Sequence, residues 1–210
     1  MPARALLWCA AAVLVSGCTH MVAGRVSPPG GALDVGSKSP VDVETVMLDK
    51  ARMRAITGAG EDLNIIPSMD GKTPVDIEQF AKDAPPQCGW IFEETKTFGA
   101  DVEGFHKTTF QNPPRGGLIS EGAAAYRDKS VARRAFEDLV KLVDGCGSTS
   151  SGPIFVGDWT AGTDSLRTRH GGCGRDYRLK SVVLVEVTFC AFPSSVPEIV
   201  LANMLAKVPG

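Results

Sequence analysis

Four cysteines constrain the fold of this chain more than any other feature of its sequence. They are Cys88, Cys146, Cys173 and Cys190, and two disulfides among them could be paired in three ways. A structural zinc site is the competing interpretation, but no two of the four are close enough to form a C-x-x-C motif. Disulfides persist mainly outside the cytoplasm, so the choice depends on where the chain folds.

The N-terminus indicates export. A short basic start precedes an apolar run over residues 5–15, which is too short to span a bilayer as a stable helix. The next residues, Val15-Ser16-Gly17-Cys18, resemble the bacterial lipobox, in which the cysteine is diacylated and the chain is cut just before it. We therefore expect a signal peptide over residues 1–17 and a diacylglyceryl, palmitate-bearing Cys18. Ordinary cleavage near Ser16-Gly17 is the alternative.

Lipidation would hold the chain at the extracytoplasmic face of the cell membrane, because two or three acyl chains bind far more firmly than one. Cleavage would remove Cys9 and the lipid would occupy Cys18, which leaves an even set of four cysteines for two disulfides. Residues 18–40 are rich in Gly, Pro and Ser and are expected to form a flexible linker. Residues 41–210 are long enough for one domain with its own core.

The net charge is close to zero, so it excludes few classes of protein and indicates no strongly charged partner. Lys plus Arg number 22 and Asp plus Glu number 24, which gives a net charge of −2. Nothing in this pattern indicates a nucleic-acid partner, and no motif indicates a metal or another cofactor. No second hydrophobic segment of membrane-spanning length follows the leader.

Caps and apolar periodicity predict three helices. The first spans residues 49–58, and the second spans residues 128–145, so that Cys146 directly follows its last turn. The last begins with a capping box formed by Ser195 and Glu198. Its predicted buried stripe comprises Ile199, Ala202, Leu205 and Val208.

Strand-like segments occupy most of the remaining domain. They cover residues 105–110, 118–127, 154–160, 164–170 and 173–190, whereas the polar, proline-rich residues 61–87 are expected to cross the surface. The last segment is predicted to be a hairpin with Ser181 and Val182 at its turn. This register places Cys173 opposite Cys190 at a non-hydrogen-bonded position, where the Cβ atoms approach most closely. A bridge between them leaves Cys88 to pair with Cys146.

One feature resists this register. It places Tyr177 and Leu179 on the opposite face from the apolar residues Val183, Val185 and Val187, and a one-residue bulge could reconcile the two faces. Adjacent strands with helices between and after them predict an α+β fold, a twisted, mainly antiparallel β-sheet with helices packed on one face and two disulfides.

The order of these features resembles the PknH-like extracellular sensor domain of actinobacteria over about residues 44–209. That domain occurs outside a serine/threonine receptor kinase and in stand-alone lipoproteins. The resemblance implies an antiparallel sheet with flanking helices, a cleft proposed to take a small ligand, and the same two disulfides. It is carried by the helix ending at Gly58, Cys88 with Trp90, the Tyr126 strand, the Ala135-Phe136 helix running to Cys146, Trp159, the hairpin from Cys173 to Cys190, and the closing LANMLAKVP. The charged segment from Leu166 to Arg178 departs from the family pattern.

Candidate ligand-binding residues follow from side-chain chemistry. If a cleft exists, we expect it between the sheet and the loops near Trp90, Glu121 and Trp159, although core packing would also account for both indoles. Arg167 and Arg169 could face an anionic ligand or a lipid headgroup, because guanidinium groups suit phosphate and carboxylate. A solvated strand face is the alternative for both arginines.

The sequence offers little for catalysis. It contains no G-x-S-x-G, H-E-x-x-H or P-loop motif, and His106 and His170 have no nearby motif partner. The predicted function is therefore a non-enzymatic, membrane-anchored sensor or ligand-binding lipoprotein whose partner is an unknown small molecule or cell-envelope component. A carrier of an apolar lipid or glycolipid and a cryptic envelope hydrolase remain as alternatives.

Overall fold

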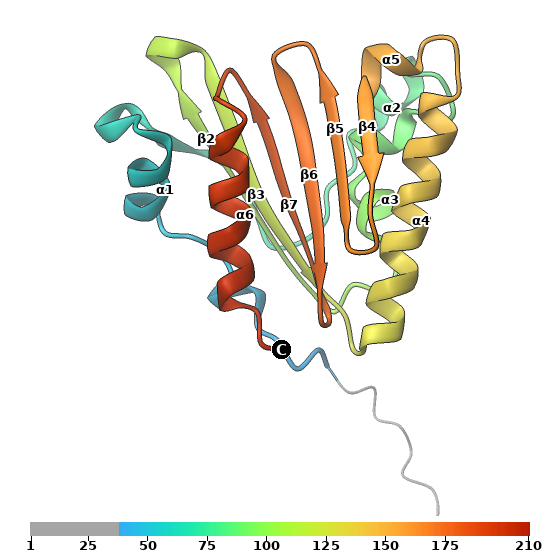
Figure 1. The fold of residues 1–210 in the computed structure, drawn as a ribbon, viewed down its shortest axis with the longest axis horizontal. Coiled ribbons are helices and arrows are strands. Elements are labelled where there is room, and N and C mark those ends of the chain that lie inside the picture. The colour runs from blue at the N-terminus through green and yellow to red at the C-terminus, as the bar shows by residue number, and fades with distance from the viewer. Residues whose placement is uncertain (1–37) are drawn as a thin grey trace, which may run out of the picture. The chain divides into compact units, whose positions relative to one another are not determined.

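The strands form one antiparallel sheet in the computed structural model, which describes residues 38–210 (Figure 1). The expected signal peptide, the lipidated Cys18 and nearly all of the linker lie outside the described residues. Seven strands pair in the order β1-β2-β3-β7-β6-β5-β4. Their bounds are β1 Asn64–Gly71, β2 Gly104–Asn112, β3 Gly117–Ala125, β4 Asp158–Ala161, β5 Ser165–His170, β6 Cys173–Lys180 and β7 Val183–Cys190.

The helices are short except for two. The longer ones are α4, Lys129–Gly147, and α6, Ser195–Lys207, and no helix within residues 38–210 has the length and hydropathy needed to cross a bilayer. The others are η1 Val43–Thr45, α1 Lys50–Thr57, η2 Gly60–Asp62, α2 Glu78–Asp83, η3 Gly89–Phe92, α3 Glu94–Phe98, η4 Pro113–Arg115 and α5 Gly152–Phe155. The first predicted helix is confirmed, because Asp49 caps α1 by accepting from the Arg52 N–H and Gly58 ends it in the left-handed conformation.

Helices cover both faces of the sheet, so the expectation of helices on one face is wrong, although the α+β class and the antiparallel sheet are confirmed. Alternate residues along β2, β3 and β7 contribute to two separate cores. Val183, Val185 and Val187 of β7 pack with α6 and α1, whereas Leu184 packs with α4 and η3. In Figure 1, α6 lies in front of the sheet and α2 and α3 lie behind it. We call these the α6 face and the α4 face.

The two cores also explain the conflict in the hairpin register. Lys180 pairs with Val183 and Cys173 pairs with Cys190 without any bulge. Tyr177 and Leu179 indeed point away from the valines of β7, but they are buried in the core of the α4 face. A register that buries apolar residues on both faces needs no correction when both faces are covered.

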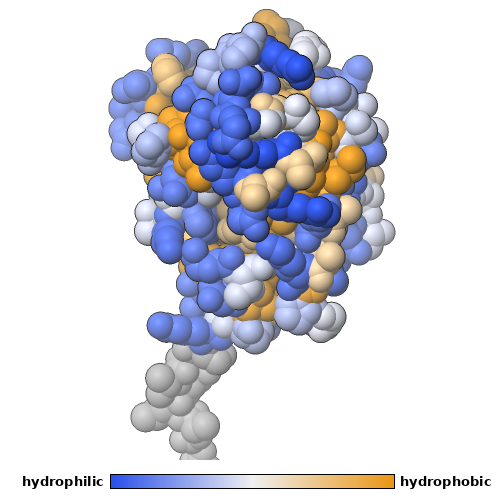
Figure 2. Space-filling model, turned by 90° about the vertical axis from the view of Figure 1, so that its left-hand side faces the viewer, coloured by the Kyte–Doolittle hydropathy of each residue, from blue (hydrophilic) through white to orange (hydrophobic). Residues whose placement is uncertain are grey.

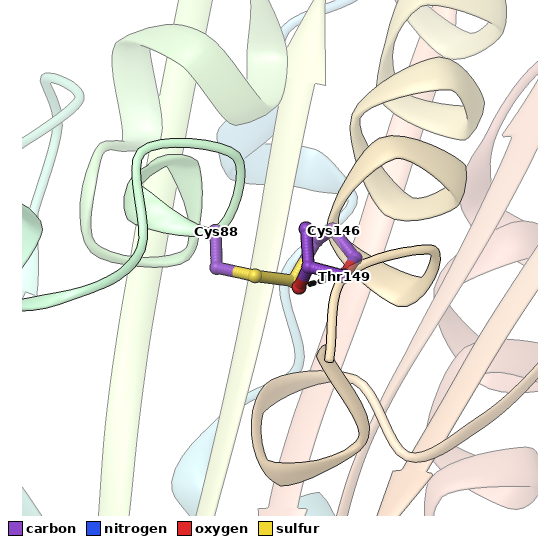
Figure 3. Close-up of a disulfide and its surroundings, with 3 residues drawn as sticks. All are labelled: Cys88, Cys146 and Thr149. Carbon is purple, nitrogen blue, oxygen red and sulfur yellow. Dashed lines mark hydrogen bonds between the residues drawn. A yellow bond between two sulfur atoms is a disulfide. The ribbon is translucent and has the colours of Figure 1, made fainter. Parts of the chain in front are cut away.

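Both predicted disulfides are confirmed. Cys173 and Cys190 are bonded across the hairpin, and Cys88 is bonded to Cys146 over a sequence separation of 58 residues. Figure 3 shows the second bridge joining the loop before η3 to the end of α4. The helix continues to Gly147, so Cys146 lies in its last turn rather than after it, and its carbonyl accepts from the Thr149 hydroxyl at 2.8 Å.

Two local expectations are corrected by the structure. Residues 61–87 do not only cross the surface, because they contain strand β1 and helix α2. Their many charged and polar residues give neither element a clear apolar pattern in the sequence. In α6 no side-chain cap is formed, and Glu198 pairs instead with Arg167 at 3.0 Å. The buried residues of α6 are Val196, Pro197, Val200, Leu201 and Met204, so Ile199 is turned outward and is 45% exposed.

The outer surface agrees with this arrangement. The side of the molecule at the left of Figure 1 is largely hydrophilic, with apolar residues showing between the polar ones (Figure 2). Most of the large apolar side chains of residues 38–210 are buried in the two cores.

Candidate functional site

A cleft opens on the α4 face, between the sheet and the segment that runs from β1 to α3. Its cavity has a volume of about 290 Å³. The floor comes from four adjacent strands and is polar, with Lys107, Thr109, Ser120, Arg175, Glu186 and Thr188. The wall is mainly apolar, with Val75, Ile77, Ile91 and Phe92, and Met69 of β1 and Phe105 of β2 also line the cleft.

Lys107 and Glu186 form the centre of the floor. The Lys107 Nζ lies 3.2 Å from the Glu186 Oε2 and 2.9 Å from the Glu94 Oε1. The other Glu186 oxygen accepts from the Thr188 hydroxyl at 2.6 Å and from the Tyr177 hydroxyl at 3.4 Å. The side chain of Glu186 is 1% exposed, so nearly all of its hydration has been replaced by these partners.

The electrostatics of the floor favour charged side chains. Burial would raise the pKa of Glu186, but Lys107 and Arg175 outweigh it and lower the pKa below its usual value. Burial would likewise lower the pKa of Lys107, but Glu186 and Glu94 raise it. Both groups therefore remain ionised at neutral pH.

Arg175 of β6 lies beside the Lys107–Glu186 pair and has fewer close hydrogen-bond partners than either of them. Its Nη2 donates to the carbonyl oxygen of Ile91 at 3.2 Å, which links the floor to the wall. Burial would lower the pKa of Arg175, but Tyr177 and Glu186 raise it, so it stays charged. No carboxylate of residues 38–210 lies within 4.0 Å of its guanidinium group.

The wall is fastened to the start of α3 by backbone and side-chain hydrogen bonds. Glu94 accepts from the Val75 N–H at 2.8 Å, and Asp76 accepts from the Thr95 N–H at 3.0 Å and from its hydroxyl at 2.6 Å. The Ile77 N–H donates to the Phe92 carbonyl at 2.8 Å. Glu94 thus contacts both the wall and Lys107 of the floor, which sets the width of the cleft at that point.

Apolar side chains remain exposed at the mouth of the cleft. Met69 is 49% exposed, Val75 is 56% exposed and Ile77 is 40% exposed. Phe80 of α2 is 50% exposed and packs against Phe92, with ring centroids 5.7 Å apart. A group of exposed apolar residues beside a cavity is typical of a binding site.

The five residues that the sequence suggested for ligand binding do not form one site. Trp90 is buried in the core of the α4 face, where its indole N–H has no acceptor among residues 38–210, and Trp159 lies on β4 at the edge of that core. Glu121 points to the α6 face. Arg167 and Arg169 lie on β5 and contact Asp176. None of the five lines the cleft, and their ligand-binding role stays a prediction.

Glu121 has an environment of its own. Glu121 is completely buried beneath residues 41–48, and both of its carboxyl oxygens lie 3.1 Å from the backbone nitrogen of Leu48, which donates to them. Burial raises the pKa of Glu121 to about 8, against the opposing effects of that hydrogen bond and of Lys207.

The two histidines within residues 38–210 also lie outside the cleft. His106 is on β2 but points to the face opposite Lys107, where its Nε2 lies 2.9 Å from the Asp70 Oδ1 and its Nδ1 lies 3.2 Å from Glu44. The hydrogen bond to His106 lowers the pKa of Asp70. Burial lowers the pKa of His170.

Sequence reasoning missed the charged residues of the floor, although one signal was present. Glu186 interrupts the apolar run VVLVEVTF, and a carboxylate inside a strand buried on both faces requires a cationic partner. Lys107 and Arg175 come from two other strands, so only the strand order brings them to it.

Comparison with known proteins agrees with this architecture. The sequence model of a family described as the PknH-like extracellular domain matches residues 39–207. The crystal structure of the extracellular domain of PknH from Mycobacterium tuberculosis is similar, with a TM-score of 0.61 and 12% sequence identity over 82% of this chain and 98% of that one. At this identity, the likeness shows a shared fold. No curated protein matches the chain.

Proposed function

We propose that this chain is a membrane-anchored extracytoplasmic sensor that binds a small cell-envelope ligand in the cleft. The proposal proceeds from its family, because the chain belongs to the PknH-like extracellular domain family. The observation that carries this proposal is the cleft itself. Its volume of about 290 Å³, apolar wall and few convergent polar groups are the features typical of ligand sites in proteins.

Binding without catalysis is the function that the floor supports best. A general acid or base works well when its pKa lies near the operating pH. Lys107 and Glu186 are shifted the opposite way, because each holds the other in its charged form. His106 and His170, either of which a hydrolase could use as its base, do not line the cleft. If the protein is a hydrolase instead, His106→Ala or His170→Ala would abolish an activity in an envelope-hydrolase assay without lowering stability.

The exposed apolar residues at the cleft mouth favour a second candidate, a carrier for an apolar lipid or glycolipid. A carrier would retain its cargo through purification, whereas a sensor exchanges its ligand at equilibrium. Mass spectrometry of organic extracts of the purified protein separates the two, because acyl chains in stoichiometric amount would identify a carrier.

Membrane anchoring is proposed from the lipobox at Cys18. Cells grown with labelled palmitate should incorporate the label into the wild-type protein and not into Cys18→Ser, which should also leave the membrane fraction. Label on neither protein would contradict the anchor while leaving the cleft proposal unaffected.

Ligand binding in the cleft can be tested with a variant that obstructs it. Thr73→Trp places a large side chain at the exposed rim of the cleft, and Thr160→Trp places the same side chain on the exposed strand β4. A cell-envelope extract should raise the melting temperature of the wild-type protein and of Thr160→Trp, but not that of Thr73→Trp. An equal rise in all three proteins would place binding elsewhere, and no rise in any would contradict the proposed function.

A further inference from the structure

Most polar groups of the cleft floor are already bound to one another. The Lys107 ammonium group lies between two carboxylates, and the Thr188 hydroxyl donates to Glu186. The hydroxyls of Thr109 and Ser120 are hydrogen-bonded to each other at 2.8 Å. A sugar or another polyhydroxyl ligand needs many free donors and acceptors, and these groups offer few.

Arg175 is the exception. A guanidinium group carries five N–H donors. The Ile91 carbonyl takes one of them and the Tyr177 hydroxyl lies beside the group as a second partner, so at least three donors remain. The side chain is half-buried, faces the cavity and lacks a carboxylate partner in the described part of the chain. An ionised, partly desolvated guanidinium group with open donors favours a carboxylate or a phosphate, which it can bind through two parallel hydrogen bonds.

The rest of the cavity is small and mainly apolar, although Ser68, Thr73 and Thr97 also line it. Val75, Ile77 and Phe92 line the wall, and the apolar surface continues to the exposed Phe80 outside the mouth. A volume of about 290 Å³ lies at the lower end of the range of roughly 300–1,000 Å³ found for ligand pockets. It accommodates one short hydrocarbon chain and not the two chains of a phospholipid.

We propose that the ligand of this cleft is a single-chain anionic amphiphile, whose carboxylate or phosphate pairs with Arg175 and whose hydrocarbon chain lies against Val75, Ile77 and Phe92. This inference rests on the proposed function, because it names the chemical class bound at the same site. The carboxylates of Glu94 and Glu186 do not oppose it strongly, since Lys107 lies between them and offsets one of their two negative charges, and Arg175 itself supplies the second positive charge.

Calorimetric titration of the purified full chain with four kinds of probe separates the parts of the ligand. Dodecanoate and dodecyl phosphate carry the head and the chain, dodecanol carries the chain alone, and acetate with inorganic phosphate represents the head alone. We expect dodecanoate or dodecyl phosphate to bind at least about tenfold more tightly than dodecanol, because a charged hydrogen-bonded pair contributes that much. The preferred anion identifies the natural head as a carboxylate or a phosphate.

Two variants test the assigned contacts. Arg175→Gln should weaken dodecanoate binding about tenfold or more and leave dodecanol binding unchanged. Arg178→Gln is the matched control, because Arg178 lies on the same strand but points to the α6 face. Ile77→Ser should weaken binding of all three long-chain probes and leave acetate unaffected, since it replaces apolar contact area with a small polar side chain.

Equal affinity for dodecanoate and dodecanol, unchanged by Arg175→Gln, would overturn the anionic head while the cleft remains a binding site. If none of the four probes binds although a cell-envelope extract still protects the protein against heat, this inference fails and the proposed function stands. If neither the probes nor the extract has any effect, both fail.

Discussion

Two buried glutamates on neighbouring strands show how differently the two faces of the sheet are built. Glu121 of β3 points to the α6 face and Glu186 of β7 points to the α4 face, and their exposed fractions are 0% and 1%. Burial raises the pKa of Glu121 to about 8, whereas burial of Glu186 is outweighed by Lys107 and Arg175, which lower its pKa. Burial alone therefore does not decide the charge of a buried carboxyl group, because its partners do.

The difference extends to how each face is closed. On the α6 face, α1, α6 and the segment over residues 41–48 pack directly on apolar strand residues. On the α4 face, a cleft with ionised groups on its floor remains, and both disulfides lie on this side of the sheet. A buried charged cluster is weak evidence for stability. The proposed ligand site would give this cluster a role other than stability.

Removing the Cys88–Cys146 bridge should break the α4 face first. Cys88→Ala with Cys146→Ala should lower the free energy of unfolding by about 4 kcal/mol, because the bridge closes a long loop across 58 residues. Hydrogen exchange should rise more in α4 and η3 than in α1 and α6. Removing Cys173 and Cys190 is the control and should cost about 3 kcal/mol, since that loop spans 17 residues. Uniform loss of protection on both faces would contradict the comparison.

The charged floor can be tested by removing its central cation. Lys107→Met should lower the free energy of unfolding by about 3 kcal/mol, because it leaves the buried Glu186 without its direct partner. Urea unfolding measures this change. Adding Glu186→Met should recover part of the loss, since no unpaired charge then remains. Lys141→Met, at an exposed salt bridge, is the control and should change stability by less than about 0.5 kcal/mol. A double variant no more stable than the single one would show that packing, and not charge, explains the loss.

On the α6 face, removing a buried carboxyl group is expected to raise the free energy of unfolding rather than lower it. An unfolded Glu ionises at about pH 4.5, whereas folded Glu121 keeps its proton up to about pH 8, so the folded chain binds more protons in this window. Its contribution to stability is therefore fully present at low pH and is lost as the pH rises toward 8. Glu121→Gln should raise the free energy of unfolding at pH 7 by about 1–3 kcal/mol and flatten its decline over this window.

Thermal unfolding measured from pH 5 to pH 8 checks this prediction. The neighbouring charges that bear on Glu121 are Lys207 and Asp49, and Leu48 donates the backbone hydrogen bond. Glu186→Gln is the matched variant, and it should destabilise the chain at pH 7, because Lys107 loses an anion in direct contact and Arg175 loses a longer-range attraction. The comparison fails if both substitutions change stability in the same direction.

Sequence patterns predicted the parts of this fold that depend on neighbours in the chain. The α1 helix follows from Asp49 and Gly58, and the register of the last hairpin follows from counting outward from Ser181 and Val182. The expectation of helices on one face is wrong. The alternation of side chains along a strand shows which residues share a face of the sheet, but it does not show whether helices cover one face or both. Tyr177 was evidence for the second core and was taken instead as a sign of a bulge.

The cleft could not be predicted because its floor combines residues from four strands. Lys107 and Arg175 stand on opposite sides of Glu186 only through the strand order β2-β3-β7-β6. Trp90 was predicted to lie near a ligand site because indoles are common in ligand pockets. In the structure it is buried in the same core as the Cys88–Cys146 disulfide. Composition alone does not separate a buried core residue from a residue that lines a cavity.

The smallest effect is expected at Ile199, which the sequence placed in the buried stripe of α6. Its side chain is 45% exposed, whereas Leu201, two residues later, is 3% exposed. Ile199→Ala should change the free energy of unfolding by less than about 0.5 kcal/mol. Leu201→Ala should lower it by about 2–3 kcal/mol, because it leaves a cavity in the α6 face. Equal losses at the two positions, measured by urea unfolding, would show that α6 is rotated and that the predicted stripe, rather than the structure, describes how this face is closed.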